Sequence, residues 1–574
     1  MDRIMESLSG LPIDFVNVYI ALLRIIAPVL MLLILYRAGK PLLSFRKEPE
    51  IWALLRLPDG SALPVTHWEN IIGSHKSSDL VLQLPTISRN HAVLTRYDDG
   101  SWTITDAESK NGVRVNGRKV DICALESGDV IELGGLNVTL EPITPEQEER
   151  IARMRTKASS GLTSIVNALL LTILQALCCL GFLVNGSAEH AADILLGFGG
   201  ICAAQWAVLI FYACIRRSAF EVETIAFFLC TMGMNVIAAT VPGEVVKQLI
   251  AMGLGLALFF AVGWSLRDLE RAKVIRYGAT AAGILFLVIT LLFGKEIYGA
   301  KNWLVIGGFS LQPSELSKLC FVYVGASTMD RIMKKRNLIG FIAYSVVLCG
   351  LLALMNDFGT ALIFFVAFLA IAYMRSGSVG TIGLACTSLG FAGVIALKIA
   401  PHALRRFTIW RHIWEDPLGR GYQQTRSLMC MASGGLLGLG AGNGWMKNLF
   451  ASDTDVVFAT VTEEWGLITA MAMVAGIVIL AAFCLRSASL GRSSFYTIGA
   501  CTAASILLAQ TILNVMGTID LLPFTGVTFP FVSNGGSSML SAWGLMAFVK
   551  AADTRLDASF AIRRTTKKNR EVTE

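Results

Sequence analysis

Long apolar stretches, separated by short polar segments, cover most of this 574-residue chain. Most are about 18–24 residues long and nearly free of charge, which suits a helix that crosses a bilayer. The apolar positions are continuous rather than alternating, so the pattern predicts helices, and only helices and closed barrels satisfy their backbone groups inside a membrane. Thirteen spans are expected, at residues 13–36, 161–184, 191–214, 220–240, 245–264, 276–294, 315–331, 338–355, 358–374, 377–400, 462–484, 493–516 and 535–552.

Composition supports this interpretation, since 54% of the residues are hydrophobic and only 16% are charged. Soluble proteins are closer to a quarter charged. The net charge of +7 comes from basic residues in short loops and in the tail at 553–574. We assign this excess to orientation by the positive-inside rule rather than to nucleic-acid binding. The chain is therefore predicted to be a mainly α polytopic membrane protein with no nucleic-acid partner.

The same rule predicts which segments face which side of the membrane. The basic cluster after residue 36 places residues 1–12 outside the cytoplasm and the following segment inside. An odd number of spans then leaves the tail in the cytoplasm and the long loop at 401–461 outside it. Cysteines are scattered, and the acidic and histidine residues do not cluster at the spacing of a protein-bound metal site. No protein-built metal site is predicted.

Residues 50–142 have a different pattern. Short β-rich segments are broken by turn signals such as Asn111-Gly112 and Asn116-Gly117. Several short strands at 8–12-residue spacing are typical of a β-sandwich. A charged segment at 143–160 is expected to be a cytoplasmic linker.

Within this segment, an ordered set of residues resembles a forkhead-associated (FHA) domain. The set begins at Gly73 and continues through Ser88-Arg89-Asn90-His91, Asp106, Ser109, Asn111-Gly112 and Asn116-Gly117. The resemblance implies a phosphothreonine-binding domain in which Ser88, Arg89 and Asn111 contact the phosphopeptide and His91 braces the loop. Ser74 stands where the family usually has arginine, so a docking domain that does not read phosphate remains an alternative.

Charged residues gather at the two ends of the loop at 401–461. Arg405, Arg406 and Arg411 lie where it leaves the predicted membrane. An acidic cluster lies where it returns, made of Asp453, Asp455, Glu463 and Glu464. Arginines can hold a pyrophosphate by bidentate contacts, and a carboxylate can accept a proton from an attacking hydroxyl. The pattern suits a lipid-linked anionic substrate. The alternative is that the arginines meet headgroups and the acids begin a helix.

Several motifs in family order make residues 220–552 resemble the SEDS family (shape, elongation, division and sporulation), the RodA/FtsW type of peptidoglycan polymerase. The motifs are Trp303-Leu304, the stretches at 309–318, 357–360, 414–417, 421–423 and 433–435, Thr454-Asp455, and the stretches at 463–466, 522–526 and 530–538. The resemblance implies a ten-helix core, with the helix at 13–36 and the two at 161–214 as additions. It also implies polymerisation of lipid II into glycan strands.

The resemblance implies roles for individual residues. Asp455 is predicted to be the catalytic base, or else a ligand for a divalent cation, Mg or Mn, that serves the same end; no nucleotide cofactor is expected. The predicted substrate-binding residues are Arg405, Arg406, Trp303, Lys318, Glu315, Asp357, Gln423 and Ser433. For Glu315, Lys318 and Asp357, a structural role inside the bundle is an open alternative.

The implied partners are a class B penicillin-binding transpeptidase, a phosphothreonine-containing protein and a Ser/Thr kinase. The chain departs from the family pattern at residues 449–453, at Asn356, at Asp520 and at Asn534. The altered residues 449–453 keep open the hypothesis of a scaffold with weak catalysis that docks phosphorylated cell-wall proteins. A lipid-intermediate flippase is another alternative; it needs a polar path across the bundle, and few charges lie in the middle of the predicted helices.

Overall fold

The computed structural model describes residues 13–44, 51–76, 78–97, 100–144, 146–147, 158–185, 188–297, 300–306, 309–327, 335–376, 379–399, 401–488, 493–555 and 558–560. The predicted outer N-terminus at 1–12, most of the linker at 143–160 and most of the basic tail lie outside these residues.

Thirteen helices of at least 15 residues form one bundle in the described part of the chain, each matching a predicted span. Their bounds are α2 (Ile13–Leu43), α4 (Gly161–Asn185), α5 (Ala191–Cys214), α6 (Glu221–Thr240), α7 (Val245–Leu266), α8 (Leu269–Phe293), α9 (Pro313–Ser327), α10 (Lys335–Leu354), α11 (Phe358–Ser376), α12 (Val379–Ile399), α15 (Val457–Ala488), α16 (Ser494–Thr518) and α17 (Gly536–Ala551). Among the described residues, nine helices are long and apolar enough to cross a membrane. The prediction of a multi-pass, mainly α membrane protein is thus confirmed.

Helix α6 lies at the centre of the bundle, and every residue from Glu221 to Ala239 is buried. Small residues allow close packing of the helices around it. A Cβ added at Gly255 of α7 would lie 2.9 Å from Cδ1 of Trp543 in α17. Such small-residue contacts are typical of helices that pack in membranes, where van der Waals contact replaces the hydrophobic effect.

Residues 53–142 form a β-sandwich with its own apolar core. One sheet has the order β2-β1-β11-β10-β7-β8 and the other β4-β3-β5-β6-β9. The strands are β1 (Ala53–Arg56), β2 (Ala62–Val65), β3 (Glu69–Gly73), β4 (Leu80–Val81), β5 (Ala92–Arg96), β6 (Trp102–Asp106), β7 (Val113–Val115), β8 (Arg118–Val120), β9 (Ile122–Leu125), β10 (Val130–Leu133) and β11 (Leu136–Pro142).

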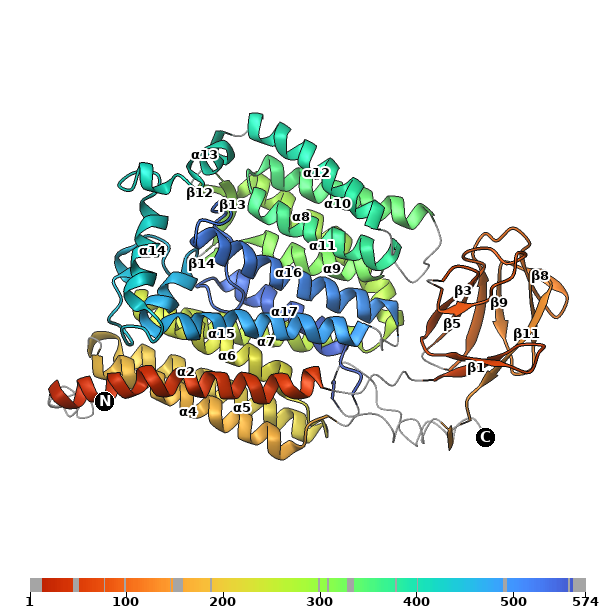
Figure 1. Cartoon of the computed structure of the whole chain (residues 1–574), viewed down its shortest axis with the longest axis horizontal. Coiled ribbons are helices and arrows are strands. Elements are labelled where there is room, and N and C mark those ends of the chain that lie inside the picture. Colours follow the sequence, from red (N-terminus) through yellow and green to blue (C-terminus); the bar gives the residue numbers. More distant parts are fainter. Residues whose placement is uncertain are drawn as a thin grey trace.

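The sandwich lies beyond one end of the bundle, and most of the irregular segments lie at the other (Figure 1). We call these the sandwich end and the loop end. The loop end carries α13 (Pro401–Ile409), α14 (Tyr422–Gly434) and a small sheet of β12 (Lys295–Ile297), β13 (Ala300–Ile306) and β14 (Phe309–Leu311). The sheet was not predicted, because residues 294–313 contain only short strands whose pairing is not visible in a local pattern.

The long loop is shorter than predicted. Helix α15 begins at Val457, five residues before the expected start at 462, and it contains Glu463 and Glu464. These acids are buried inside the helix because their carboxylates accept hydrogen bonds from backbone amides of residues 442–446. Gly466, with φ of 85°, interrupts α15 where the backbone of Leu436 approaches closely.

Candidate functional site

Asp455 lies at the loop end, two residues before α15. Its amide donates to the carbonyl of Ala451 at 3.0 Å, and its carbonyl accepts from Nδ2 of Asn514 in α16 at 2.9 Å. The same Asn514 amide donates to the carbonyl of Val527 at 2.8 Å. One buried side chain therefore fixes both the aspartate and the segment that lies over it.

That covering segment is the turn between α16 and α17. Ser533 Oγ donates to the carbonyl of Thr454 at 2.6 Å, and the Asn534 amide donates to the carbonyl of Asp453 at 2.8 Å. Asn534 Nδ2 also donates to Asp453 Oδ2 and to Glu244 Oε2, each at 2.8 Å. Residues 453–455 are thus held in place by hydrogen bonds from the C-terminal part of the chain.

The electrostatic surroundings of Asp455 favour its protonated form. Burial is the largest cause and raises the pKa of the carboxyl from its ordinary value to about 6, with a smaller contribution from Asp453. The Thr454 hydroxyl and the Arg406 guanidinium act in the opposite direction. A carboxylate with a pKa near 6 is ionised at neutral pH and is still a usable base.

Arg406 is close to this carboxylate and is exposed. Its Nη1 donates to the carbonyl of Thr525 at 2.8 Å, which ties α13 to the covering segment. Arg405 precedes it in α13, but its side chain lies outside the described part of the structure. Of the predicted arginine pair, the structure therefore places one guanidinium beside Asp455.

Asp357 forms a second polar group next to the covering segment. Its Oδ2 accepts from Asn302 Nδ2 and from Gln312 Nε2, each at 3.2 Å, and its Oδ1 accepts from the Thr360 amide at 3.1 Å. A Cβ added at Gly359 would lie 3.3 Å from the carbonyl of Thr525. Asp357 thus ties the small sheet to the first turn of α11.

The other predicted substrate-binding residues lie in different surroundings. Trp303 is half-buried on β13, opposite Lys295 of β12. Glu315 and Lys318 form an ion pair of 2.7 Å in the first turns of α9, where both are almost fully buried. The buried pair has the geometry of a structural contact, and a role in substrate binding stays a prediction.

In α14, Gln423 Nε2 donates to the carbonyl of Phe450 at 3.1 Å and so contacts the segment before Asp455. Ser433 is exposed, and its hydroxyl donates to Cys430 within the same helix. Gln423 therefore belongs to the group around Asp455, whereas the hydrogen bond of Ser433 stays within α14.

The four predicted phosphopeptide residues lie in neighbouring loops of the sandwich. His91 is fully buried; its Nδ1 accepts from the Ser88 amide at 3.1 Å, and its Nε2 lies 3.2 Å from the carbonyl of Gly112. Ser88 Oγ accepts from the Lys110 amide, and Asn111 Nδ2 donates to the carbonyl of Thr86. Arg89 is exposed. The histidine joins the two loops that carry the other three residues.

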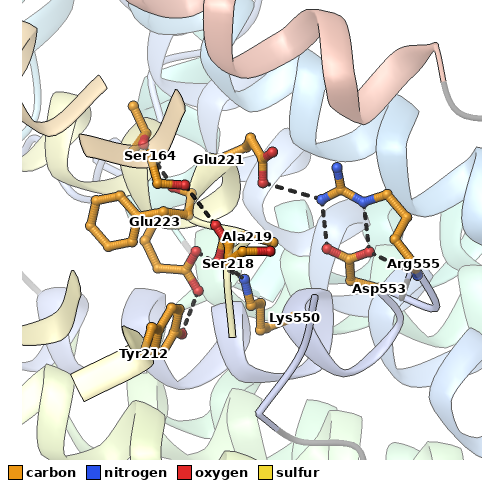
Figure 2. A network of polar contacts seen from close by, with 11 residues as sticks. Ser164, Tyr212, Ser218, Ala219, Glu221, Glu223, Lys550, Asp553 and Arg555 are labelled. Atoms are coloured by element: carbon orange, nitrogen blue, oxygen red, sulfur yellow. Dashed lines mark hydrogen bonds and ion pairs between the residues drawn. The ribbon is translucent and has the colours of Figure 1, made fainter. Parts of the chain in front are cut away.

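A further polar cluster at the sandwich end was not predicted (Figure 2). Arg555 donates from Nε and Nη2 to Asp553 at 2.9 and 2.7 Å and from Nη2 to Glu221 at 3.3 Å. Lys550 pairs with Glu223 at 3.1 Å, and the Tyr212 hydroxyl donates to the same glutamate at 2.6 Å. The cluster joins α5, α6 and α17 through buried charges, because its members are almost fully excluded from solvent.

Metal binding was tested on the residues that the structure describes. Among them, no group of three or more histidine, cysteine, aspartate or glutamate side chains is arranged to hold an ion. Around Asp455, the carboxylates of Asp453 and Glu244 are both bound to the Asn534 amide instead. Within the described part of the chain, the side chains near Asp455 thus do not form a three-ligand site for Mg or Mn, and a role of Asp455 as a ligand for a divalent cation stays a prediction.

Sequence reasoning missed the residues that hold Asp455. Asn514, Ser533 and Asn534 lie about 60 to 80 positions away from it along the chain. A usable signal was present, because residues 530–538 were among the stretches that carried the family resemblance. No individual role was predicted for these residues, because a local pattern does not show which distant segment their side chains contact.

Comparisons with known proteins identify relatives of this chain. The peptidoglycan glycosyltransferase RodA of Mycobacterium tuberculosis is 31% identical over 324 residues, which is 53% of this chain and 69% of the relative. The probable peptidoglycan glycosyltransferase FtsW of Escherichia coli O6:H1 is 34% identical over 281 residues, or 46% of this chain and 67% of the relative.

A solved structure, described as the structural coordination of polymerization and crosslinking by a peptidoglycan synthase complex, contains a similar chain. It has a TM-score of 0.50 and 25% identity, and the match covers 57% of this chain and 96% of that one. An FHA domain model matches residues 70–134, which confirms the resemblance of the sandwich. The model of the FtsW, RodA and SpoVE cell cycle proteins matches residues 224–557, more than half of the sequence, and this chain therefore belongs to that family.

Proposed function

We propose that this chain is a peptidoglycan glycosyltransferase that polymerises lipid II into glycan strands at its loop end. The observation that carries the proposal is the half-buried Asp455, with a pKa near 6, beside the exposed guanidinium of Arg406. Family membership and the names of the relatives support the same activity. They do not favour the flippase or the scaffold hypothesis.

The proposed reaction uses both charges. The Asp455 carboxylate removes the proton from an acceptor sugar hydroxyl while that oxygen bonds to the anomeric carbon of the donor. The bond from this carbon to the pyrophosphate oxygen breaks, and the lipid pyrophosphate leaves with the electron pair. Arg406, together with Arg405, stabilises the growing negative charge by hydrogen bonds and charge. The hydrogen bonds to residues 453–455 hold the base in place, and this lowers the entropic part of the activation free energy.

We also propose how the chain is oriented in the membrane and which proteins are its partners. The loop end faces away from the cytoplasm and the sandwich end faces it, which is supported by the basic residues in the segments at the sandwich end. A class B penicillin-binding transpeptidase cross-links the product; support comes from the similar chain in a complex described as coordinating polymerization and crosslinking. The FHA domain binds a phosphothreonine made by a Ser/Thr kinase on a partner, through Ser88, Arg89 and Asn111.

The test is glycan polymerisation from lipid II by the purified full-length chain, with and without a co-purified transpeptidase. We expect polymer from wild type and none from Asp455→Ala. Asp193→Ala is the matched control, because Asp193 is a carboxylate at the same end that lies 3.6 Å from the nearby His190 imidazole. Equal polymer from Asp455→Ala would reject the role of Asp455, and no polymer from any folded pairing would reject the polymerase.

The proposal for the FHA domain has a separate test. The full-length chain should be retained on a phosphothreonine-peptide library and not on the same library with threonine. Arg89→Ala should abolish the difference, because it removes the exposed guanidinium. Equal retention on both libraries would favour a docking domain that does not read phosphate.

A further inference from the structure

Helices α2 and α4 lie outside the residues matched by the family model. Both nevertheless extend to the loop end of the bundle (Figure 1). We propose that they position the glycosyl-transfer site and that Asn185, the last residue of α4, is the positioning residue. The proposal rests on the proposed glycosyltransferase function. It concerns residues 436–446, a glycine-rich segment that we call the bracing loop.

The first step is the contact between Asn185 and the bracing loop. Asn185 Nδ2 donates to the carbonyl of Ala441 and to Oδ1 of Asn443, both at 2.7 Å. Ala441 is almost fully buried. The amide at the end of α4 thus fixes the backbone carbonyl of a nearly buried loop residue through a partly buried hydrogen bond.

The helices also contact the loop closely through apolar groups. A Cβ added at Gly440, which has φ of +102°, would lie 2.5 Å from Cγ2 of Ile20 in α2, and one added at Gly181 of α4 would lie 3.4 Å from Cβ of Ala441. The Phe182 ring lies 6.3 Å from the Trp465 ring of α15. The loop is therefore enclosed between the two additional helices and α15.

The second step leads from the bracing loop to Asp455. Glu464 accepts hydrogen bonds from the amides of Gly442 and Gly444, and Glu463 accepts one from the amide of Met446. Met446 packs with Leu449 and Val456 in a small apolar cluster of its own. Asp455 lies between Leu449 and Val456 along the chain. A displacement of the bracing loop therefore moves the residues that hold the Asp455 carboxylate in place.

The opposite end of α4 is also anchored. Ser164 Oγ donates to the carbonyl of Ser218 at 2.6 Å, immediately before α6 and its buried charge cluster (Figure 2). Because α4 is fixed at both ends, it holds the bracing loop in place and does not simply move with it. A mutation far from the reacting atoms can reduce the rate by about 100-fold when it displaces a catalytic group by a small distance.

The test compares Asn185→Leu with Asn167→Leu in the full-length protein. Asn167 is the matched control because it is on the same helix and accepts from Arg37 of α2 at 3.1 Å, at the sandwich end. With lipid II as substrate, we expect kcat to fall about tenfold or more in Asn185→Leu with little change in KM. Asn167→Leu should stay within about twofold of wild type, and Asn185→Gln, which keeps the amide donor, should recover part of the loss.

A second readout does not depend on activity. Hydrogen–deuterium exchange of peptides covering residues 436–456 should be faster in Asn185→Leu than in Asn167→Leu, at similar melting temperatures. Equal kcat and equal exchange in the two variants would overturn the proposal. If wild type makes no polymer, the proposed function fails, and the exchange data still decide whether Asn185 holds the bracing loop.

Discussion

Two aspartates at opposite ends of the bundle show how the same side chain takes different roles. Asp553 at the sandwich end is fully buried, and although burial opposes its charge, Arg555 and Lys550 hold its pKa below the ordinary value. Asp455 at the loop end is half-buried; burial raises its pKa to about 6, and the Thr454 hydroxyl and the Arg406 guanidinium offset this only in part. A compensated carboxylate stabilises a fold, whereas an uncompensated one is available for proton transfer.

The largest effect is expected from breaking the compensated cluster. Arg555→Met leaves the carboxylates of Asp553 and Glu221 buried without their cation, so we expect a loss of about 3–5 kcal/mol in the free energy of unfolding. Thermal unfolding in detergent measures this loss. Adding Asp553→Asn and Glu221→Gln should restore most of the stability, and activity per folded molecule should stay near wild type. An unchanged melting temperature in the single variant would contradict the role of the cluster.

The next effect concerns the ionisation of Asp455. As a general base it must be deprotonated, so activity should rise with pH through about 6 and then level off. Polymerisation should be about tenfold slower at pH 5 than at pH 7, since only about a tenth of the carboxyl is ionised one unit below its pKa. Values of kcat/KM from pH 5 to 8, measured at lipid II concentrations well below KM, give the profile of the free enzyme. A flat profile would assign the limiting step to another group.

The smallest effect tests the cost of the uncompensated charge. A carboxyl whose pKa is raised by folding destabilises the folded state increasingly as the pH rises from its ordinary pKa of 3.8 to about 6, and by a constant amount above that. Asp455→Asn should therefore raise the free energy of unfolding by about 1 kcal/mol at pH 8, after allowance for solvent screening, while it abolishes polymerisation. The difference should be about half as large at pH 5, and it should vanish only below about pH 4, where the carboxyl is protonated in both the folded and the unfolded protein. A variant less stable than wild type at pH 8 would show that Asp455 is structural.

The sequence was sufficient for the helices and the two domains because those depend on local patterns. Continuous apolar segments gave all thirteen helices, and turn signals gave the sandwich. The start of α15 was misplaced because Glu463 and Glu464 look like the exposed beginning of a helix, whereas their carboxylates bind amides of a distant loop.

The charged residues of the site were predicted from the sequence, but the residues that hold them in place were not. Asp455 and Arg406 stood out because charges near a membrane are costly without a role. The hydrogen bonds from Asn514 and Asn534 depend on tertiary contacts that a local pattern does not contain. The same holds for the buried cluster, in which Glu223 meets Lys550 across 327 positions of the chain.

The FHA domain is inserted between α2 and α4, so both of its ends are tethered to the membrane-embedded bundle. Only residues 44–52 separate α2 from β1, and nine residues span at most about 35 Å. A partner anchored in the same membrane meets this domain within a thin layer, where short tethers give effective concentrations in the millimolar range. A docking affinity too weak to detect with a free peptide in solution is then strong enough to keep such a partner beside the enzyme.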